Sequence, residues 1–210
     1  MPCADCPHSL QRSSYPAGFW GLTRRTLLKS LFGVGLELSF FDHIANAARK
    51  KDPRRSRLTP GDRLVFAFDD RKGQPITPED ILIGERPAFA YPMDPITEVV
   101  RSRFRLNQVL LIRIKPEELS ERTREHALGG LVCYSAVCTH TGCDVSEWIG
   151  PTQNLVCPCH ASFFNPKDRG RVVGGPAPKP LATLPLEVVD GVLTVKAPFI
   201  GRVGFNKKKK

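Results

Sequence analysis

The sequence predicts an all-β protein, and three observations support this fold class. Apolar and polar residues alternate with a period of two in several runs, as they do in strands with one buried face. β-branched and aromatic residues are frequent in these runs, and turns that contain glycine separate them. The chain of 210 residues is long enough for one ordinary core with extensions, so we expect one domain and a leader.

Strands are expected at four places along the chain. Residues 62–76 alternate before a glycine-containing turn, residues 108–115 form a second β-rich run, and residues 130–137 form a third. Residues 184–197 predict a hairpin. There, two apolar runs flank Asp190-Gly191, a pair that tolerates the positive φ angles of a two-residue turn.

The segments outside the strands have the composition of connections. Residues 116–130 have helical propensity but little apolar surface, and we expect a short exposed helix or a loop there. Residues 48–59 are basic and without periodicity, which is typical of a linker. Residues 206–210 form a lysine tail that we expect to be solvated. The predicted domain therefore spans residues 60–205.

The N-terminus has the pattern of an export signal. The stretch TRRTLLK at residues 23–29 resembles the twin-arginine motif, an apolar run follows, and Ala45-Asn46-Ala47 fits a cleavage site. We expect a twin-arginine signal peptide over residues 1–47 and a periplasmic mature protein. An amphipathic helix and a retained anchor in the inner membrane are the alternatives. The anchor is disfavoured because Glu37 and Asp42 leave only short apolar runs.

The charge of the chain limits the class of partner. A formal net charge of +10 favours an acidic partner or association with an anionic membrane surface. Nucleic acid is not expected as a partner, because the Lys and Arg residues are scattered rather than striped along one helix.

Two short motifs concentrate the cysteines and histidines. They read AVCTHTGC at residues 136–143 and CPCHASFF at residues 157–164, and each holds two cysteines and one histidine. Cys138-x-His140 and Cys157-x-x-His160 each offer one thiolate and one imidazole on a tight loop. The two loops together can therefore supply four metal ligands.

Two metal centres fit these four ligands. Zinc accepts two Cys and two His tetrahedrally, and a [2Fe-2S] centre of the Rieske type takes two Cys on one iron and two His on the other. Each loop also carries a spare cysteine, Cys143 or Cys159, placed for a disulfide that links the loops over a cofactor. Such a bond persists in the oxidising compartment to which the export signal leads. The spare cysteines favour the iron-sulfur centre, and a structural zinc-binding module is the alternative of another class.

Residues 136–181 closely resemble the Rieske iron-sulfur proteins of the cytochrome bc and bf type. The loops of that family read Cys-Thr-His-Leu-Gly-Cys and Cys-Pro-Cys-His-Gly-Ser, with a proline-rich loop after them. This chain has CTHTGC, CPCHASFF and GRVVGGPAPKPL. The resemblance implies a Rieske-type antiparallel β-sandwich with a small cluster-binding subdomain at about residues 134–181, and one [2Fe-2S] cluster.

The resemblance also implies a role for the motif residues. Cys138 and Cys157 would bind the buried iron. His140 and His160 would bind the outer iron. Cys143 and Cys159 would form the disulfide. Ser162 matches a serine whose hydroxyl bonds a cluster sulfide.

Three residues depart from the quinol-oxidising members. Phe164 stands where high-potential members have a tyrosine that bonds a ligand cysteine sulfur, so we expect one hydrogen bond fewer and a lower potential. Thr141 replaces a leucine beside the outer histidine, and Ala161 replaces a glycine. Because that leucine lies on the face that docks a quinone pocket, these changes put quinol docking in doubt.

The function implied by the resemblance is electron transfer. The chain would be the iron-sulfur subunit of a quinol-cytochrome c reductase-like respiratory complex, not catalytic alone. Its redox partner would be a c-type cytochrome or a larger oxidoreductase subunit, with quinol as a further candidate. The alternative is the small Rieske subunit of arsenite-oxidase-like molybdenum enzymes, which the ending APFIGRVGF at residues 197–205 resembles.

The remaining histidines are too few to build the second iron site of a Rieske oxygenase. An oxygenase needs a further iron on two histidines and a carboxylate, and outside the motifs and the leader only His126 remains. We interpret His126 as a surface residue and Cys133 as a small buried apolar residue. Cys3 and Cys6 belong to the leader and have no assigned role.

Overall fold

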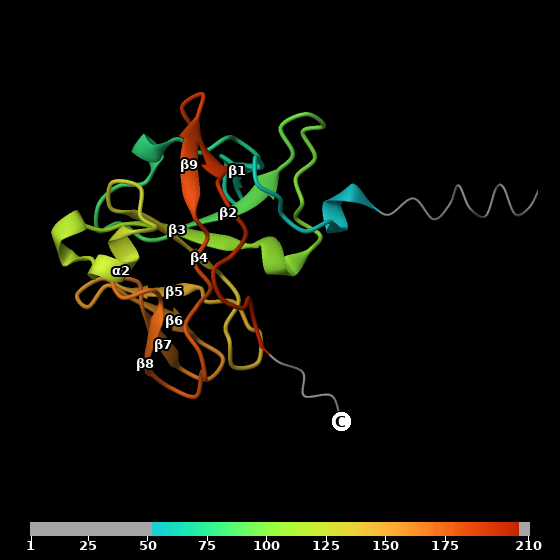
Figure 1. The fold of residues 1–210 in the computed structure, drawn as a ribbon. Helices are drawn as coiled ribbons and strands as arrows, with labels where there is room; N and C mark the ends of the chain where they lie inside the picture. Colours follow the sequence, from blue (N-terminus) through green and yellow to red (C-terminus); the bar gives the residue numbers. More distant parts are fainter. Residues whose placement is uncertain (1–51, 206–210) are drawn as a thin grey trace, which may run out of the picture. The chain divides into compact units, whose positions relative to one another are not determined.

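The structure is a computed structural model that describes residues 52–205. These residues form ten strands in two antiparallel sheets, with four 3-10 helices and one short α-helix (Figure 1). The predicted leader and export motif, Cys3 and Cys6, and the lysine tail lie outside the described residues. Within the described part, no helix has both the length and the apolar character needed to cross a membrane.

The two sheets differ in size and in position along the chain. The larger sheet has the order β4-β3-β2-β1-β10-β9 and the smaller has the order β5-β6-β7-β8. The larger sheet contains β1 (Arg63–Phe66), β2 (Ala88–Met93), β3 (Val109–Arg113), β4 (Leu131–Ser135), β9 (Leu186–Val189) and β10 (Val192–Val195). The smaller sheet contains β5 (Glu147–Ile149), β6 (Asn154–Cys157), β7 (Ser162–Asn165) and β8 (Arg171–Gly174). The helical segments are η1 (Pro53–Arg55), η2 (Pro78–Asp80), η3 (Arg105–Asn107), η4 (Pro116–Glu118) and α2 (Glu121–Arg124).

The predicted all-β fold is confirmed, and the hairpin near the C-terminus shows how a local sequence pattern predicted one of its parts. β9 and β10 pair antiparallel with Val189 opposite Val192. The two residues between them, Asp190 and Gly191, have φ angles of 52° and 77°. Positive φ at both positions is what the hairpin turn compatible with strand twist requires.

The larger sheet closes on itself. The Ser135 N–H in β4 donates to the Ala182 carbonyl at 2.8 Å, and the Leu184 N–H donates to the Cys133 carbonyl at 2.8 Å. The same segment then enters β9, where Leu186 pairs with β10. One continuous segment thus pairs with β4 at one edge of the sheet and then forms β9 at the other, so that the β4 edge does not present a long row of unpaired backbone groups.

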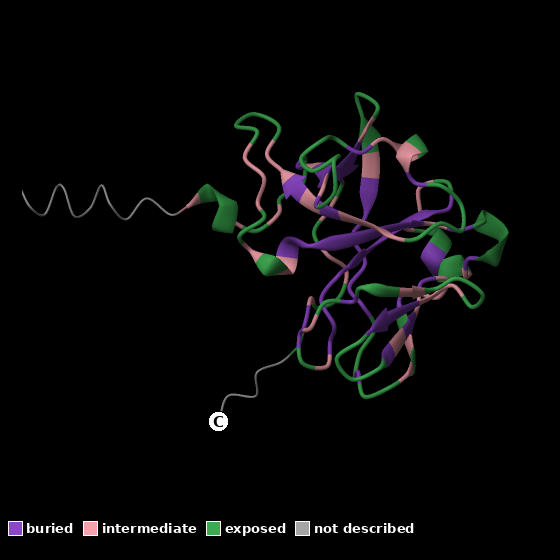
Figure 2. Cartoon of the chain, turned by 180° about the vertical axis from the view of Figure 1, so that it is seen from behind, coloured by how far each residue is buried: buried purple, intermediate pink, exposed green. Residues whose placement is uncertain are grey.

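β3 and β4 are buried on both faces, and this arrangement positions the motif region. All residues of both strands are buried except Arg113 at the end of β3, and Figure 2 colours the strands by this burial. Because side chains alternate across a strand, each strand contributes to two cores. The core shared with the smaller sheet contains Leu110, Ile112, Val132, Tyr134, Ala136, Cys138, Leu155, Cys157 and Phe164. The core inside the larger sheet contains Leu64, Val109, Leu111, Leu131, Cys133, Leu184 and Leu193.

The basic segment predicted as a linker lies against the domain from Asp52 onward. Asp52 forms an ion pair with Arg103 at 2.8 Å, and the Leu58 N–H donates to the Asn107 side-chain oxygen at 3.0 Å. Leu58 also packs on the inner core. The composition of the segment could not show this, because its partners lie about fifty residues further along the chain.

Candidate metal centre

The first motif forms a tight loop directly after β4. The Cys138 N–H donates to the Cys143 carbonyl at 2.8 Å, and the Gly142 N–H donates back to the Cys138 carbonyl at 3.1 Å. Val145 donates to the carbonyl of Ala136 at 2.8 Å and continues the pairing. The alternation of β4 extends through the loop, so Cys138 faces the core shared with the smaller sheet while Cys133 faces the other core.

The second motif forms the loop between β6 and β7. Cys157 and Ser162 pair across the two strands and close the loop. Cys159 and His160 donate their backbone N–H groups to the Cys157 sulfur. Ala161 takes a φ of 52° to turn the chain.

The two loops meet side by side. A disulfide joins Cys143 of the first loop to Cys159 of the second. The rings of His140 and His160 lie edge to face, with centroids 4.7 Å apart. His140 is partly buried and His160 is exposed. The sulfurs of Cys138 and Cys157 are close enough to interact, and neither cysteine is in a disulfide. The structure thus brings together all six residues that the motifs predict.

A third segment, the proline-rich loop after β8, packs against both motif loops. The Thr139 hydroxyl donates to the Lys179 carbonyl at 2.6 Å. A Cβ added at Gly175, whose φ is 79°, would lie 2.1 Å from the Ala161 carbonyl oxygen. Only glycine allows so close an approach. The loop therefore covers one side of the candidate centre.

Two further contacts support the first loop, and both come from segments that the motifs do not include. The ring of Phe205 lies against Gly142, where an added Cβ would be 2.6 Å from it. Arg105 in η3 pairs with Asp144 at 2.6 Å. Both residues are far from the first loop in sequence, and no pattern around Phe205 or Arg105 predicts these contacts.

Unpartnered polar atoms test whether these residues fit a metal group. In the described residues, three buried side-chain atoms have no hydrogen-bond partner, namely His140 Nδ1, Gln153 Oε1 and Ser162 Oγ. A buried polar atom without a partner costs about 1–3 kcal/mol. Two of the three belong to the motif loops, and an imidazole nitrogen is a common metal ligand. Gln153 lies in the turn between β5 and β6, away from the motifs.

The two buried thiols complete the donor set. Cys138 and Cys157 are 0% and 2% exposed. Burial raises the pKa of the Cys157 thiol, as does the neighbouring Cys138 sulfur, whereas the N–H groups of Cys159 and His160 lower that pKa. Metal binding deprotonates a thiol, so a bound metal would replace the proton that burial favours. Two thiolates and two imidazoles fit a [2Fe-2S] group of the Rieske type.

Three sulfurs near the centre, those of Cys143, Cys157 and Cys159, lie close together but cannot act as a metal site. The Cys143, Cys157 and Cys159 sulfurs lie within 4.8 Å of one another. Two of them form the disulfide and have no thiolate to offer. Cys157 is therefore the one thiol of this trio that is available to a metal.

Comparison with known proteins decides the family. The Rieske [2Fe-2S] domain family matches residues 105–185. The cytochrome bc1 complex Rieske iron-sulfur subunit of Streptomyces lividans is 33% identical over 62% of this chain and 79% of its own length. The putative respiratory nitrate reductase subunit Rieske of Haloferax mediterranei is 31% identical over 96% of this chain and 91% of its own length.

This chain belongs to the Rieske family. Its cofactor is accordingly one [2Fe-2S] cluster, and the family match does not favour the zinc alternative. Among solved structures, a plasma membrane Rieske protein of Synechocystis is 28% identical over 43% of this chain and 77% of its own, with a TM-score of 0.32. A hyperthermophilic respiratory Complex III chain is 19% identical over 81% of this chain and 99% of its own, with a TM-score of 0.39. The chain spans 38% of the corresponding bc1 subunit of Streptomyces coelicolor.

The residue at position 164 is expected to lower the potential of this Rieske centre. Phe164 in β7 is 0% exposed and packs in the same core as Cys157. A tyrosine there could donate a hydrogen bond to a cysteine sulfur, which favours the reduced cluster. Such a bond to a charged group is worth about 1.5 kcal/mol, or about 60 mV for one electron. Phe164→Tyr is therefore expected to raise the midpoint potential by about 60 mV in a redox titration.

The neighbouring Phe163 provides the control for this prediction. Phe163 points to the opposite face of β7 and contacts Gly174 instead of the cluster-side core. Phe163→Tyr should leave the midpoint unchanged. Equal midpoints in wild type and Phe164→Tyr would show that this position does not set the potential.

Ala161 holds a backbone conformation that favours glycine. Its φ of 52° is left-handed and it is exposed at the tip of the second loop. The Cβ destabilises this conformation by about 1–2 kcal/mol. Replacing alanine by glycine removes that cost but also raises the conformational entropy of the unfolded chain, which offsets part of the gain in stability. Ala161→Gly is expected to raise the free energy of unfolding by about 0.5 kcal/mol in urea denaturation. Ala197→Gly, at a residue without positive φ, should lower that energy, and a loss at both sites would contradict the prediction.

Proposed function

We propose that this Rieske protein is the iron-sulfur subunit of a quinol-cytochrome c reductase-like complex. Cys138 and Cys157 would hold one iron, and His140 and His160 the other. The observation that supports this best is the unpartnered, buried Nδ1 atom of His140, beside a second imidazole and two free thiols. We place the cluster-binding subdomain at about residues 134–181, the region that contains the smaller sheet.

Buried and exposed residues of the site would have different roles in electron transfer. The cluster, when bound, supplies one-electron exchange at a potential of about −150 to +300 mV. The buried Cys138 and Cys157 exclude water from the inner side. The exposed His160 lies where a partner protein can approach. The unpartnered Ser162 hydroxyl is available to donate to the cluster and would raise its potential.

The proposed compartment of this function rests on the sequence pattern at the N-terminus. We infer that residues 1–47 direct export by the twin-arginine route, so that the protein acts in the periplasm at the inner membrane. The Cys143–Cys159 disulfide supports this compartment, because disulfides persist where the environment is oxidising.

A nitrate reductase complex is the second candidate assembly. The Haloferax mediterranei relative matches 96% of this chain, whereas the Streptomyces lividans bc1 subunit matches 62%. Phe164 and Thr141 also depart from the quinol-oxidising pattern. The relatives described above do not favour an arsenite-oxidase-like assembly.

Purification of the native complex distinguishes the two assemblies. The full chain would be tagged in its own host and isolated from gently solubilised membranes. Co-purification of b-type and c-type haem subunits with quinol-dependent cytochrome c reduction supports the first candidate. Nitrate reduction by the purified complex, without quinol-dependent cytochrome c reduction, would replace it with the second.

A further inference from the structure

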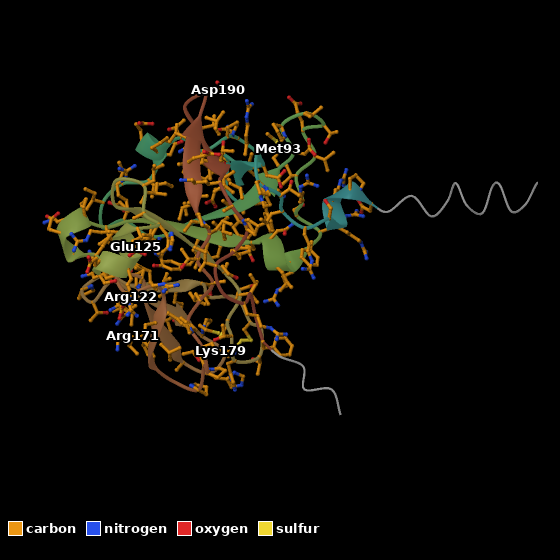
Figure 3. All side chains as sticks on the ribbon, in the orientation of Figure 1. Met93, Arg122, Glu125, Arg171, Lys179 and Asp190 are labelled. Carbon is orange, nitrogen blue, oxygen red and sulfur yellow. A yellow bond between two sulfur atoms is a disulfide. The ribbon has the colours of Figure 1, made fainter. Side chains whose placement is uncertain are left out.

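A basic groove lies beside the candidate centre, and none of its residues is a candidate ligand of the cluster. It is an open pocket of about 440 Å³. Four segments form it: α2, the β7–β8 turn, the proline-rich loop and the C-terminal segment. Figure 3 shows Arg122 and Arg171 on the same side of the smaller sheet, with Lys179 at its lower end. We call this pocket the basic groove, and its charged residues are Arg122, Asp168, Arg169, Arg171, Lys179 and Arg202.

The groove concentrates positive charge in a domain whose numbers of positive and negative residues are nearly equal. Residues 52–205 carry 20 Lys or Arg and 18 Asp or Glu. The groove has five cations and one carboxylate. That carboxylate, Asp168, is paired with Arg171 at 2.7 Å. Within the described range, the other four cations make no ion pair. Their charge is therefore available to an anionic partner.

Apart from Thr183, the rest of the groove is lined by residues without polar side chains. Leu181 is buried, Ile200 is partly buried and Pro180 is exposed. An apolar centre with a charged rim rich in arginine is the composition of a protein–protein interface. A lipid headgroup or a free phosphate would use the cations but not this apolar floor.

The groove is directly connected to the motif loops. The Lys179 carbonyl accepts the hydroxyl proton of Thr139, which lies between Cys138 and His140 in sequence. The Leu181 N–H donates to the Gly170 carbonyl at 3.0 Å and ties the same loop to the β7–β8 turn. A protein seated in the groove would therefore lie beside the first motif loop.

We propose that the basic groove docks the acidic face of the protein that exchanges electrons with this subunit. This inference rests on the proposed electron-transfer function and adds the site and the charge of its partner. Complementary charge raises the rate of encounter and fixes orientation. The groove would thus bring the partner to the cluster loops, and its arginines would set which partners are accepted.

A charge-modified cytochrome provides a defined probe. The probes are a lysine-rich c-type cytochrome and the same cytochrome with its lysines succinylated, which makes it acidic. Binding to the full-length holoprotein is measured by calorimetry at low salt, where the Debye length is about 30 Å. The groove variant is Arg122→Glu/Lys179→Glu/Arg202→Glu. The control is Arg55→Glu/Lys72→Glu/Arg86→Glu, which changes the net charge equally at exposed residues outside the groove.

The expected result is a groove-dependent preference for the acidic probe. The succinylated cytochrome should bind about tenfold more tightly than the native one, and the groove variant should lose about tenfold in affinity while the control keeps it. Equal losses in both variants would overturn the proposal, since net charge alone would then explain binding. Loss of binding to phosphatidylglycerol vesicles in the groove variant, with cytochrome binding unchanged, would also overturn it in favour of a membrane.

The same samples separate this proposal from the proposed function. Binding requires no electron transfer, whereas reduction of the cytochrome by the dithionite-reduced protein requires the cluster. Binding without reduction in a sample that contains iron and sulfide would refute the electron-transfer role and leave the docking surface intact. Reduction with no dependence on the groove would refute the docking surface alone.

Discussion

Cys138→Ala is expected to abolish the [2Fe-2S] cluster completely, whereas Cys133→Ala is expected to leave it intact. Both cysteines are nearly inaccessible, with exposures of 0% and 1%, and they lie five residues apart on opposite faces of the same extended segment. Removing the sulfur costs both variants a similar amount of packing, about 1 kcal/mol. Only Cys138 would lose a metal ligand in addition.

The comparison of these two variants isolates the ligand role. Iron, acid-labile sulfide and visible absorption per protein are measured after maturation in the same host. Circular dichroism then verifies that each variant keeps its β structure. A cluster present in Cys138→Ala, or absent from Cys133→Ala, would contradict the assignment of the buried ligands.

Removing the disulfide is expected to destabilise the protein by about 3 kcal/mol, the value for a closed loop of about 15 residues. The two cysteines are separated by 16 positions and connect the loops that carry His140 and His160. Without this bond, the loops are held mainly by the proline-rich loop and by strand pairing. Loss of the cluster on heating should therefore begin at a lower temperature, which visible absorption during a thermal ramp would detect.

A double-mutant comparison tests whether one bond causes the whole effect. Cys143→Ala, Cys159→Ala and the double variant should lose the same stability in urea, because each removes the same disulfide. Losses that add in the double variant would show that the two cysteines act independently. The buried Cys133 again supplies a control for replacement of a sulfur by a methyl group.

The sequence predicted the parts of the fold that depend on local patterns. Alternation located β1, β3 and β4, and Asp190-Gly191 located the turn between β9 and β10. β2 was not predicted, and it contains Pro92, a residue type that is unfavourable in central strands. The structure accommodates Pro92 because the pairing of β2 with β3 ends at Ala90, so the missing N–H is not needed there.

At the candidate site too, the sequence predicted contacts within short motifs but not contacts between segments far apart in the chain. The spacing of the two motifs predicted which residues meet, because the four candidate ligands and both disulfide cysteines lie on two short loops. The supports contributed by Phe205, Arg105 and Gly175 depend on chain segments that meet only after folding. The strands of the smaller sheet have three or four residues each, too short for periodicity to identify.

The most direct test of the account is an EPR-monitored redox titration of the protein matured and exported in a twin-arginine-competent host. The account predicts a rhombic signal with a low average g value in the reduced state, and a midpoint that falls at alkaline pH. A folded, metal-loaded sample that gives no such signal would contradict a histidine-ligated [2Fe-2S] cluster in this chain.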